Sequence, residues 1–367
     1  MAVEIRLDRS KSLEAQPDKG HNRWHPDIPP VVTVPSGQRI VLETLDSRDG
    51  MITMASTDAD VAGHNRNIGH PLTGPVAVQG AEPGDLLAIH IEEIAPQPFA
   101  WTANNKNFGF LRDLYAEPHV TRWRIQDGFA TSQDLPGVRI PGAPFMGVMG
   151  VAPSREQHRA WLAREEALAQ RGGMVRPPEP DRAVPRAFGK DGLRTIPPRE
   201  NGGNVDIRHL VAGTTVFLPV WQPGARFSAG DAHFAQGDGE VCGTAIEMGA
   251  TFSARLELLK GKAGKQQDLS FEWQGGTLPP GLRPPRRYFA TTGLCVHRDG
   301  RNESEDVTLA ARNALLNMIE HLQRSYGYDD KQAYHLCSVA VNLHLSEVVD
   351  LPNVTVSAFL PLDIFES

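Results

Sequence analysis

Glycine and proline recur along the whole chain and limit the length of its regular elements. The 367 residues include 35 Gly and 29 Pro, spread through the sequence without a repeat or a low-complexity tract. Proline removes a backbone N–H donor and glycine favours turns, so both residue types interrupt long helices. The pattern predicts many short strands joined by turns, with few helices.

Alternating apolar residues mark where these strands are expected. The clearest pair lies within 74–94, where Pro83 and Gly84 form a turn between two alternating segments. Three helices are also expected: one after an N-cap at Ser154, one with a single apolar face, and one short helix, covering 154–171, 305–324 and 330–340. We therefore expect a mainly β protein with α/β additions and a β-sandwich or barrel-like architecture.

The domain organisation leaves two possibilities open. A change of composition near 190–200 divides the chain into an N-terminal β-rich part, 1–195, with the inserted helix 154–171, and a C-terminal β-rich part, 196–367. The second part would carry the polar motif at 230–247 and the C-terminal helices. The same pattern also fits one intertwined domain.

Charge and cysteine content exclude several classes of protein. The chain has 37 Lys and Arg against 44 Asp and Glu, a formal net charge of −7, and no basic cluster, so neither a nucleic acid nor an anionic membrane is an expected partner. The polar N-terminus and the lack of a long apolar run indicate a cytoplasmic protein. Its three cysteines, an odd and scattered set, are expected to be reduced.

The densest polar segment lies at 230–247. Asp231 and His233 stand two residues apart, as do Glu240 and Cys242, so on two extended segments each pair would share a face. A hairpin turning at the intervening glycines would bring carboxylates and an imidazole together, which is the donor set that a divalent metal requires. The structural alternative is a polar turn with a capping aspartate and a hydrogen-bonded histidine.

Three further clusters carry polar groups next to turns. An acidic cluster at 46–50 follows a strand, His70 precedes a Pro-rich turn at 71–75, and a Gly-Gly pair at 202–203 stands within the polar loop 199–206. Acidic side chains at a strand end either ligate a metal or form Asx turns, and Gly-Gly permits a close approach between backbone and ligand.

Several familiar catalytic motifs are absent from the sequence, among them G-x-S-x-G, G-x-x-x-x-G-K-[ST] and H-E-x-x-H. Cys242 could act as a nucleophile if a neighbouring base lowered its pKa. Its structural alternative is a small buried residue on a strand.

The motifs together resemble the acetamidase/formamidase family of aliphatic amidases. The stretches that carry the resemblance are GHNRWHPDIPP at 20–30, PLTGPVAVQGAEPGDLL at 71–87, PPRENGGNVDIRHL at 197–210, GDAHFAQGDGEVCGTAIEMG at 230–249, RNALLNMIEHL at 312–322 and VVDLPNVTVSAFLP at 348–361. They follow one another over nearly the whole chain, and the opening stretch resembles the formamidase-type branch. The resemblance implies hydrolysis of a short-chain amide to ammonia and a carboxylate, a divalent metal and a homo-oligomer.

Chemical reasoning assigns provisional roles within these motifs. The metal ligands are expected to be Asp231, His233 and Glu240, with Asp46 and Asp49 as candidates for the same or a second ion, and zinc is favoured. A carboxylate, Glu247 or Glu200, would carry the proton. The side chains expected to hold the amide substrate are Asn204, Gln236 and His70.

Two alternatives compete with metal-dependent hydrolysis. One is a metal-independent amidase in which Cys242 attacks the amide with help from a neighbouring glutamate. The other is a small-molecule binding protein that has lost catalysis. A chelator would inactivate a metal-dependent amidase but not the cysteine amidase. An assay for ammonia release would distinguish either enzyme from a binding protein.

Overall fold

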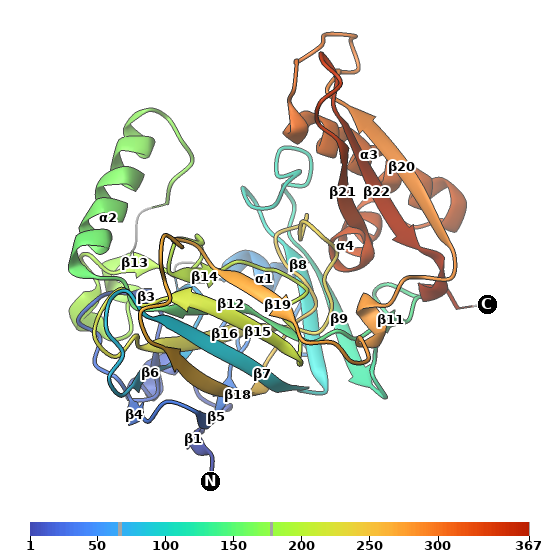
Figure 1. Ribbon diagram of the computed structural model, residues 1–367. Coiled ribbons are helices and arrows are strands. Elements are labelled where there is room, and N and C mark those ends of the chain that lie inside the picture. The colour runs from blue at the N-terminus through green and yellow to red at the C-terminus, as the bar shows by residue number, and fades with distance from the viewer. Residues whose placement is uncertain (65–67, 177–178, 367) are drawn as a thin grey trace.

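Two large open sheets form the framework of the protein in the computed structural model, which describes residues 1–64, 68–176 and 179–366 (Figure 1). The first sheet has the strand order β1 (Val3–Ile5), β5 (Gln38–Thr44), β18 (Ala250–Leu259), β7 (Leu86–Pro96), β15 (Thr214–Pro219) and β19 (Ser270–Trp273). Over the described residues neither large sheet closes into a barrel. The expectation of a mainly β protein is confirmed.

The second large sheet carries the functional motif. Its main path is β11 (Ile140–Pro141), β10 (Phe129–Thr131), β9 (His119–Gln126), β8 (Phe99–Asn104), β17 (Glu247–Met248), β16 (Phe227–His233), β12 (Phe145–Val151) and β14 (Gly202–Asn204). Off this path, β6 (Leu72–Val78) pairs with β16, β2 (Gly20–His21) and β4 (Val32–Val34). A separate ribbon joins β3 (Arg23–Trp24) to β13 (Leu193–Arg194).

Both large sheets take strands from either side of residues 195–196. In the first sheet β18 pairs antiparallel with β5 and β7, and in the second β16 pairs with β6 and β12. Strands that follow one another in sequence can belong to different sheets. For example, β6 and β7 lie on either side of one turn but belong to different sheets.

The C-terminal part adds a smaller α/β layer, drawn in orange and red in Figure 1. There β22 (Thr355–Pro361) lies between β20 (Tyr288–Leu294) and β21 (Asn342–Glu347), with α3 (Val307–Tyr326) packed on β20 and β22 and α4 (Asp330–Ala340) packed on α3. These two helices confirm the predictions at 305–324 and 330–340. The prediction at 154–171 is confirmed by α2 (Arg155–Gln170), whose first turn is capped by the Ser154 side chain.

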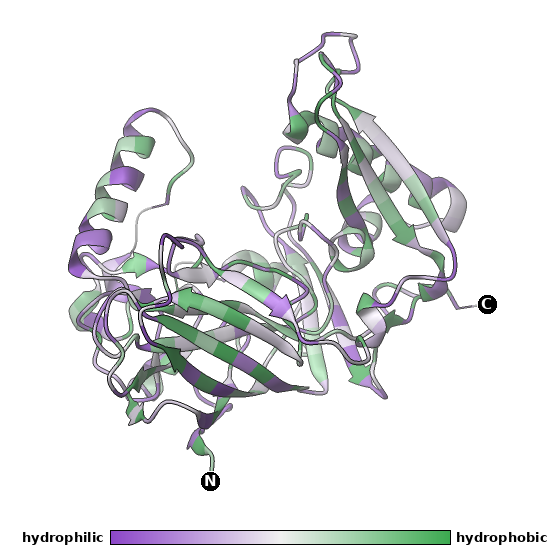
Figure 2. Ribbon diagram, viewed as in Figure 1, coloured by the Kyte–Doolittle hydropathy of each residue, from purple (hydrophilic) through white to green (hydrophobic). Residues whose placement is uncertain are grey.

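The remaining described helices are short. They are α1 (Asp58–Gly63) and the single 3₁₀ turns at Leu13–Ala15, Pro180–Arg182, Arg186–Phe188, Pro280–Leu282 and Leu362–Ile364. Among the described residues no helix is long and apolar enough to cross a membrane. Figure 2 shows hydrophobic and hydrophilic bands alternating along the strands of the first sheet, as expected where a sheet covers the core with one face.

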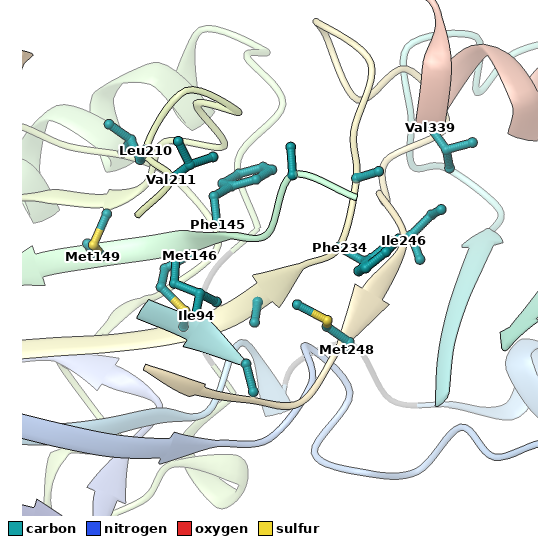
Figure 3. Close-up of a cluster of buried hydrophobic side chains, with 14 of the residues drawn as sticks. Ile94, Phe145, Met146, Met149, Leu210, Val211, Phe234, Ile246, Met248 and Val339 are labelled. Atoms are coloured by element: carbon teal, nitrogen blue, oxygen red, sulfur yellow. The ribbon is translucent and has the colours of Figure 1, made fainter. Parts of the chain in front are cut away.

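A cluster of buried apolar side chains packs against the polar motif at 230–247. The labelled members include Phe145 of β12, Phe234 and Ile246 at the two ends of the connection between β16 and β17, and Met248 of β17 (Figure 3). The Phe145 ring meets the His233 imidazole edge-on, with the ring centroids 5.0 Å apart. This packing fixes the imidazole from one side and keeps water away from it.

Candidate active site

The motif at 230–247 forms an antiparallel pair with a long connection. His233, at the end of β16, lies opposite Glu247 of β17, so these two side chains meet across the strands. Glu240 and Cys242 were expected on a second extended segment, but both lie in the connection, where Glu240 has a left-handed φ of 46°. Their side chains diverge: Glu240 lines a cavity, whereas Cys242 enters the core.

His233 stands at the centre of the polar cluster. Its Nε2 atom lies 3.5 Å from an oxygen of Asp231 and 3.3 Å from an oxygen of Glu247, and all three side chains are buried. Its other nitrogen, Nδ1, donates to Oε1 of Gln236 at 2.9 Å, and Nε2 of Gln236 donates to the backbone oxygen of Asp206. This chain of hydrogen bonds places a proton on Nδ1 and directs Nε2 at the carboxylates. Although burial opposes it, Glu247 and Asp231 raise the pKa of His233, so without a bound cation Nε2 also tends to carry a proton.

Glu247 is held as an ionised carboxylate. The Ser47 hydroxyl donates to its Oε2 at 2.7 Å, and the Ala245 N–H donates to its Oε1 at 3.0 Å. Burial alone would raise the pKa of Glu247, but His233 and the hydroxyl of Ser47 hold it below its ordinary range. Glu247 is therefore suited to bind a cation and poorly suited to carry a proton.

A second group of potential ligands shares the same histidine. Asp206 and Glu240, together with His233, offer ligand atoms within 4.8 Å of one another, as do Asp231, His233 and Glu247. Burial, reinforced by neighbouring carboxylates, raises the pKa of Asp206, Asp231 and Glu240. Asp206 was named in the sequence only as part of a polar loop; no spacing rule relates it to β16.

Three polar atoms of the described cluster have no hydrogen-bond partner, which fits a cation. Among the described residues, Oδ1 of Asp231, Oδ1 of Asp206 and Nε2 of His233 are buried without a hydrogen-bond partner. Buried polar atoms are costly when they are left unsatisfied, and here several electron-pair donors face one another. A divalent cation would satisfy them and remove the repulsion between the carboxylates.

Glycine at 147 makes room for this arrangement. Gly147 of β12 lies beside Asp231, and a Cβ atom built on it would lie 2.6 Å from Oδ1 of Asp206 and 3.0 Å from Oδ2 of Asp231. No other residue type leaves space for both carboxylates. The sequence shows this glycine within an irregular Gly- and Pro-rich segment and gives no signal that it borders the site.

A cavity of ≈ 80 Å³ opens above the cluster. Asp231, Glu240 and Glu247 line it together with His70 and Asn204, two of the expected substrate contacts. His70 Nδ1 lies 3.5 Å from Oδ2 of Asp231 and, like Oδ1 of Asn204, has no hydrogen-bond partner among the described residues. Burial lowers the pKa of His70 to about 4, so its imidazole is neutral near pH 7.

Apart from His233, which lies behind the lining carboxylates, four of the expected site residues lie outside the cavity lining. Glu200 forms an ion pair with Arg164 instead, with two contacts of 2.6 and 3.0 Å. Asp46 accepts hydrogen bonds from its own loop, as in the turn alternative. Asp49 instead accepts a long-range bond from the N–H of Leu13. The last of the four is Gln236, whose amide is bonded at both ends and supports His233.

Cys242 has the surroundings of a structural residue. It is 0% exposed, its thiol lies 3.4 Å from the backbone oxygen of Thr244, and it does not line the cavity. Burial raises the pKa of the Cys242 thiol, which disfavours the thiolate that a nucleophile needs. All three cysteines are buried and none forms a disulfide.

The fold and the site define an enzyme with a buried histidine–carboxylate centre beneath a small cavity, and comparisons with known proteins give its family. The family model described as acetamidase/formamidase matches residues 6–367, so the chain belongs to the acetamidase/formamidase family. This confirms the resemblance seen in the motifs and makes the chain an enzyme of the amidase class.

Named relatives align over almost the whole chain. An acetamidase of Mycolicibacterium smegmatis is 37% identical over 374 residues, covering 90% of this chain and 88% of that protein. A formamidase of Methylophilus methylotrophus is 34% identical over 388 residues, covering 100% of this chain and 94% of that protein. The solved structure of a gamma lactamase from Delftia acidovorans, 36% identical, superposes with a TM-score of 0.92 over 100% of this chain and 94% of the other.

Proposed function

We propose that this chain hydrolyses a short-chain aliphatic amide, formamide or acetamide, to ammonia and the carboxylate, with the cluster around His233 as a metal centre. The observation that carries the proposal is the unpartnered Nε2 of His233, which faces two carboxylates at the floor of a cavity. The acetamidase and formamidase relatives support the choice of substrate.

The ligand set that fits best is Asp231, His233 and Glu247. All three are buried, and their ligand atoms already converge. One histidine and two carboxylates suit a divalent ion, and zinc is the first candidate. When bound, such an ion lowers the pKa of water towards 7 and polarises the amide carbonyl.

The chain's own residues supply the proton transfers and the orientation of the substrate. Glu240 lines the cavity and has a raised pKa, so it can accept a proton from water and return it to the leaving nitrogen. His70 and Asn204 can hold the two ends of the amide group, since each has an unused polar atom at the cavity. Gln236 positions His233 through its hydrogen bond to Nδ1.

Two broader properties belong to the same proposal. The family membership supports a homo-oligomer, which sedimentation at micromolar concentration would test: a single species of 40 kDa would contradict it. The three unbridged cysteines support a cytoplasmic setting, because reduced thiols persist there.

The deciding experiment combines metal analysis with ammonia release from a panel of amides. We expect formamide or acetamide to be turned over, activity to fall after treatment with a chelator, and activity to return when zinc is added. The Cys242→Ser variant serves as the matched control and retains turnover. Undiminished activity in a metal-free preparation would contradict the metal centre, and no ammonia from any amide would contradict the proposed reaction.

A further inference from the structure

Three arginines line the cavity together with the carboxylates. Arg48 follows β5, Arg176 follows α2, and Arg194 ends β13, so three separate segments bring a guanidinium to one small space. The proposed reaction uses none of them. Their presence gives the cavity a basic part in addition to the acidic cluster around His233.

Two of these arginines are buried, and one of them has unused hydrogen-bond donors. Arg194 is 5% exposed, and its Nε and Nη2 atoms have no hydrogen-bond partner among the described residues. Arg48 is 9% exposed and lies near the carboxylates of Glu247, Asp46 and Asp231, whose charges act on its guanidinium. A guanidinium keeps its charge and carries five donors, so burying one without partners is costly.

The third arginine is held in place by its neighbours. Nη2 of Arg176 donates to the backbone oxygen of Asn107 at 2.6 Å, and its guanidinium lies 5.9 Å from the centre of the Phe108 ring. Its backbone oxygen receives a bond of 3.4 Å from Nη1 of Arg194. Arg176 and Arg194 are thus linked to each other, while the other two donor atoms of Arg194 stay unused.

The acidic cluster does not account for Arg194. The charges that act most strongly on Arg194 are those of Arg176, Arg199, Glu179 and Glu165, and none of these belongs to the His233 cluster. Arg48, by contrast, is under the influence of Glu247 and Asp231. Arg48 therefore lies next to the acidic cluster, whereas Arg194 lies where the charges of other residues act on it more strongly than those of the cluster.

The charges of the cavity lining also favour a bound anion. Three guanidiniums and three carboxylates line it, so their formal charges cancel. A divalent cation at His233 would leave the lining with an excess of two positive charges. An anion bound by the arginines would offset part of that excess and would satisfy the unused donors.

The size of the cavity limits the anion to a small one. A volume of ≈ 80 Å³ holds roughly six water-sized spheres of about 10–15 Å³ each. Amides of a few non-hydrogen atoms fit this space, including those that carry one carboxylate, such as oxamate and malonamate. Planar guanidinium donors match the two oxygens of a carboxylate.

We propose that Arg48, Arg176 and Arg194 form a carboxylate-binding end of the active-site cavity. The inference rests on the proposed amidase function and extends it to the class of ligand. The carboxylate belongs either to a substrate that is both an amide and an acid, or to the acid that hydrolysis releases. In both cases the same guanidinium donors hold it while the amide carbon lies near His233.

The test compares the metal-loaded wild type with Arg194→Gln and Arg194→Lys. Kinetic constants for acetamide and malonamate examine the substrate source, and inhibition by acetate examines the product source. Titration calorimetry with acetate and malonamate gives a readout that does not require turnover. Arg312→Gln is the matched control, because Arg312 pairs with Asp113 on the surface of α3 and does not line the cavity.

We expect Arg194→Gln to weaken carboxylate binding by about tenfold to a hundredfold, since each hydrogen bond to a charged group contributes substantially. If the carboxylate belongs to the substrate, kcat/KM for malonamate exceeds that for acetamide and falls in this variant, mainly through KM. If it belongs to the product, only the inhibition constant of acetate rises. Arg194→Lys retains part of the binding, and Arg312→Gln behaves as wild type.

Equal affinities for acetate and malonamate in the wild type and Arg194→Gln would overturn the carboxylate-binding end, even if acetamide were still hydrolysed. Failure of the wild type to hydrolyse any amide would instead overturn the proposed function. If Arg194→Gln does not fold, as judged by its circular dichroism, Arg48→Gln provides the same comparison.

Discussion

His233 connects the two potential ligand groups, so the chemistry of the site depends on its orientation. The sequence placed Asp231 and His233 on one face of a strand, and the structure brings both to the same point as Glu247. Both residues lie in β16, but Asp231 has a left-handed φ of 56°, so regular strand alternation does not by itself explain why the two side chains meet. Sequence reasoning did not identify Asp206 as a ligand, because it reaches the cluster through the pairing of β14 with β12 and not through local spacing.

The hydrogen bond from His233 to Gln236 gives the first prediction. Gln236→Leu removes the acceptor for Nδ1, which frees the ring to rotate and change tautomer. We expect metal affinity and turnover to fall by about tenfold to a hundredfold, as is usual when the support of a ligating histidine is lost. Metal titration measures this, and Gln236→Glu, which keeps an acceptor oxygen, should recover part of the affinity. Unchanged metal affinity in Gln236→Leu would show that the bond does not orient His233.

The close packing at Gly147 gives a second prediction. In Gly147→Ala the added methyl group overlaps Oδ1 of Asp206, so the carboxylates must move apart. We expect a loss of stability of about 1–3 kcal/mol, typical of overpacking, and a large loss of activity. Gly63→Ala is the control, because its Cβ would meet nothing within 4 Å. Equal activity in the two variants would mean that the cluster tolerates displacement.

Among the elements, helices were easier to predict than strand partners. Ser154 predicts the start of α2 because its side chain caps the first turn. The apolar residues of α3 recur with the period of a helix. Both signals depend only on residues that are close in sequence. Strand pairing is set by contacts far apart in sequence. The two strands around Pro83 and Gly84 illustrate this, since a local turn joins them although they belong to different sheets.

The same distinction explains the Glu240 segment. Alternation of polar and apolar residues suggested a strand there, but Gly237 and Gly239 allow the chain to turn repeatedly, and the strand begins only at Glu247. Loop geometry of this kind depends on tertiary contacts. One example is the bond from the Gly237 N–H to the backbone oxygen of Ser338 on α4.

A buried histidine in β2 makes the sheet sensitive to pH. His21 bonds the backbone oxygen of Arg23 through Nδ1 and the Ser228 hydroxyl through Nε2, and burial lowers its pKa to about 4. The unfolded chain, with an ordinary histidine pKa near 6.5, takes up the proton first as the pH falls. The free energy of unfolding should therefore decrease below pH 6.5, by up to about 3 kcal/mol near pH 4.

Denaturant unfolding at several pH values measures this effect. His21→Gln removes the titrating group, so its stability should depend less steeply on pH between 6.5 and 4 than that of the wild type. The comparison uses slopes, because the substitution also changes stability at neutral pH. Identical slopes would mean that His21 is not the group responsible.

For the whole molecule, the proposed metal centre ties together two neighbouring strands of the second sheet. Asp231 and His233 belong to β16 and Glu247 to β17, so one ion would hold the two ends of the connection 234–246 together. A ligand that binds only the native state raises its stability. We expect zinc to raise the melting temperature of chelator-treated protein and to have little effect on His233→Ala. A melting temperature that does not respond to zinc would contradict this.

The central claim is tested most directly by bound metal and ammonia release in His233→Ala beside the wild type. This substitution removes a neutral ligand without adding charge, and circular dichroism should still report a β-rich fold. We predict that the wild type contains a divalent metal and releases ammonia from a short-chain amide, whereas His233→Ala loses turnover and most of its metal. Full activity together with full metal content in His233→Ala would contradict the claim and place the catalytic centre elsewhere.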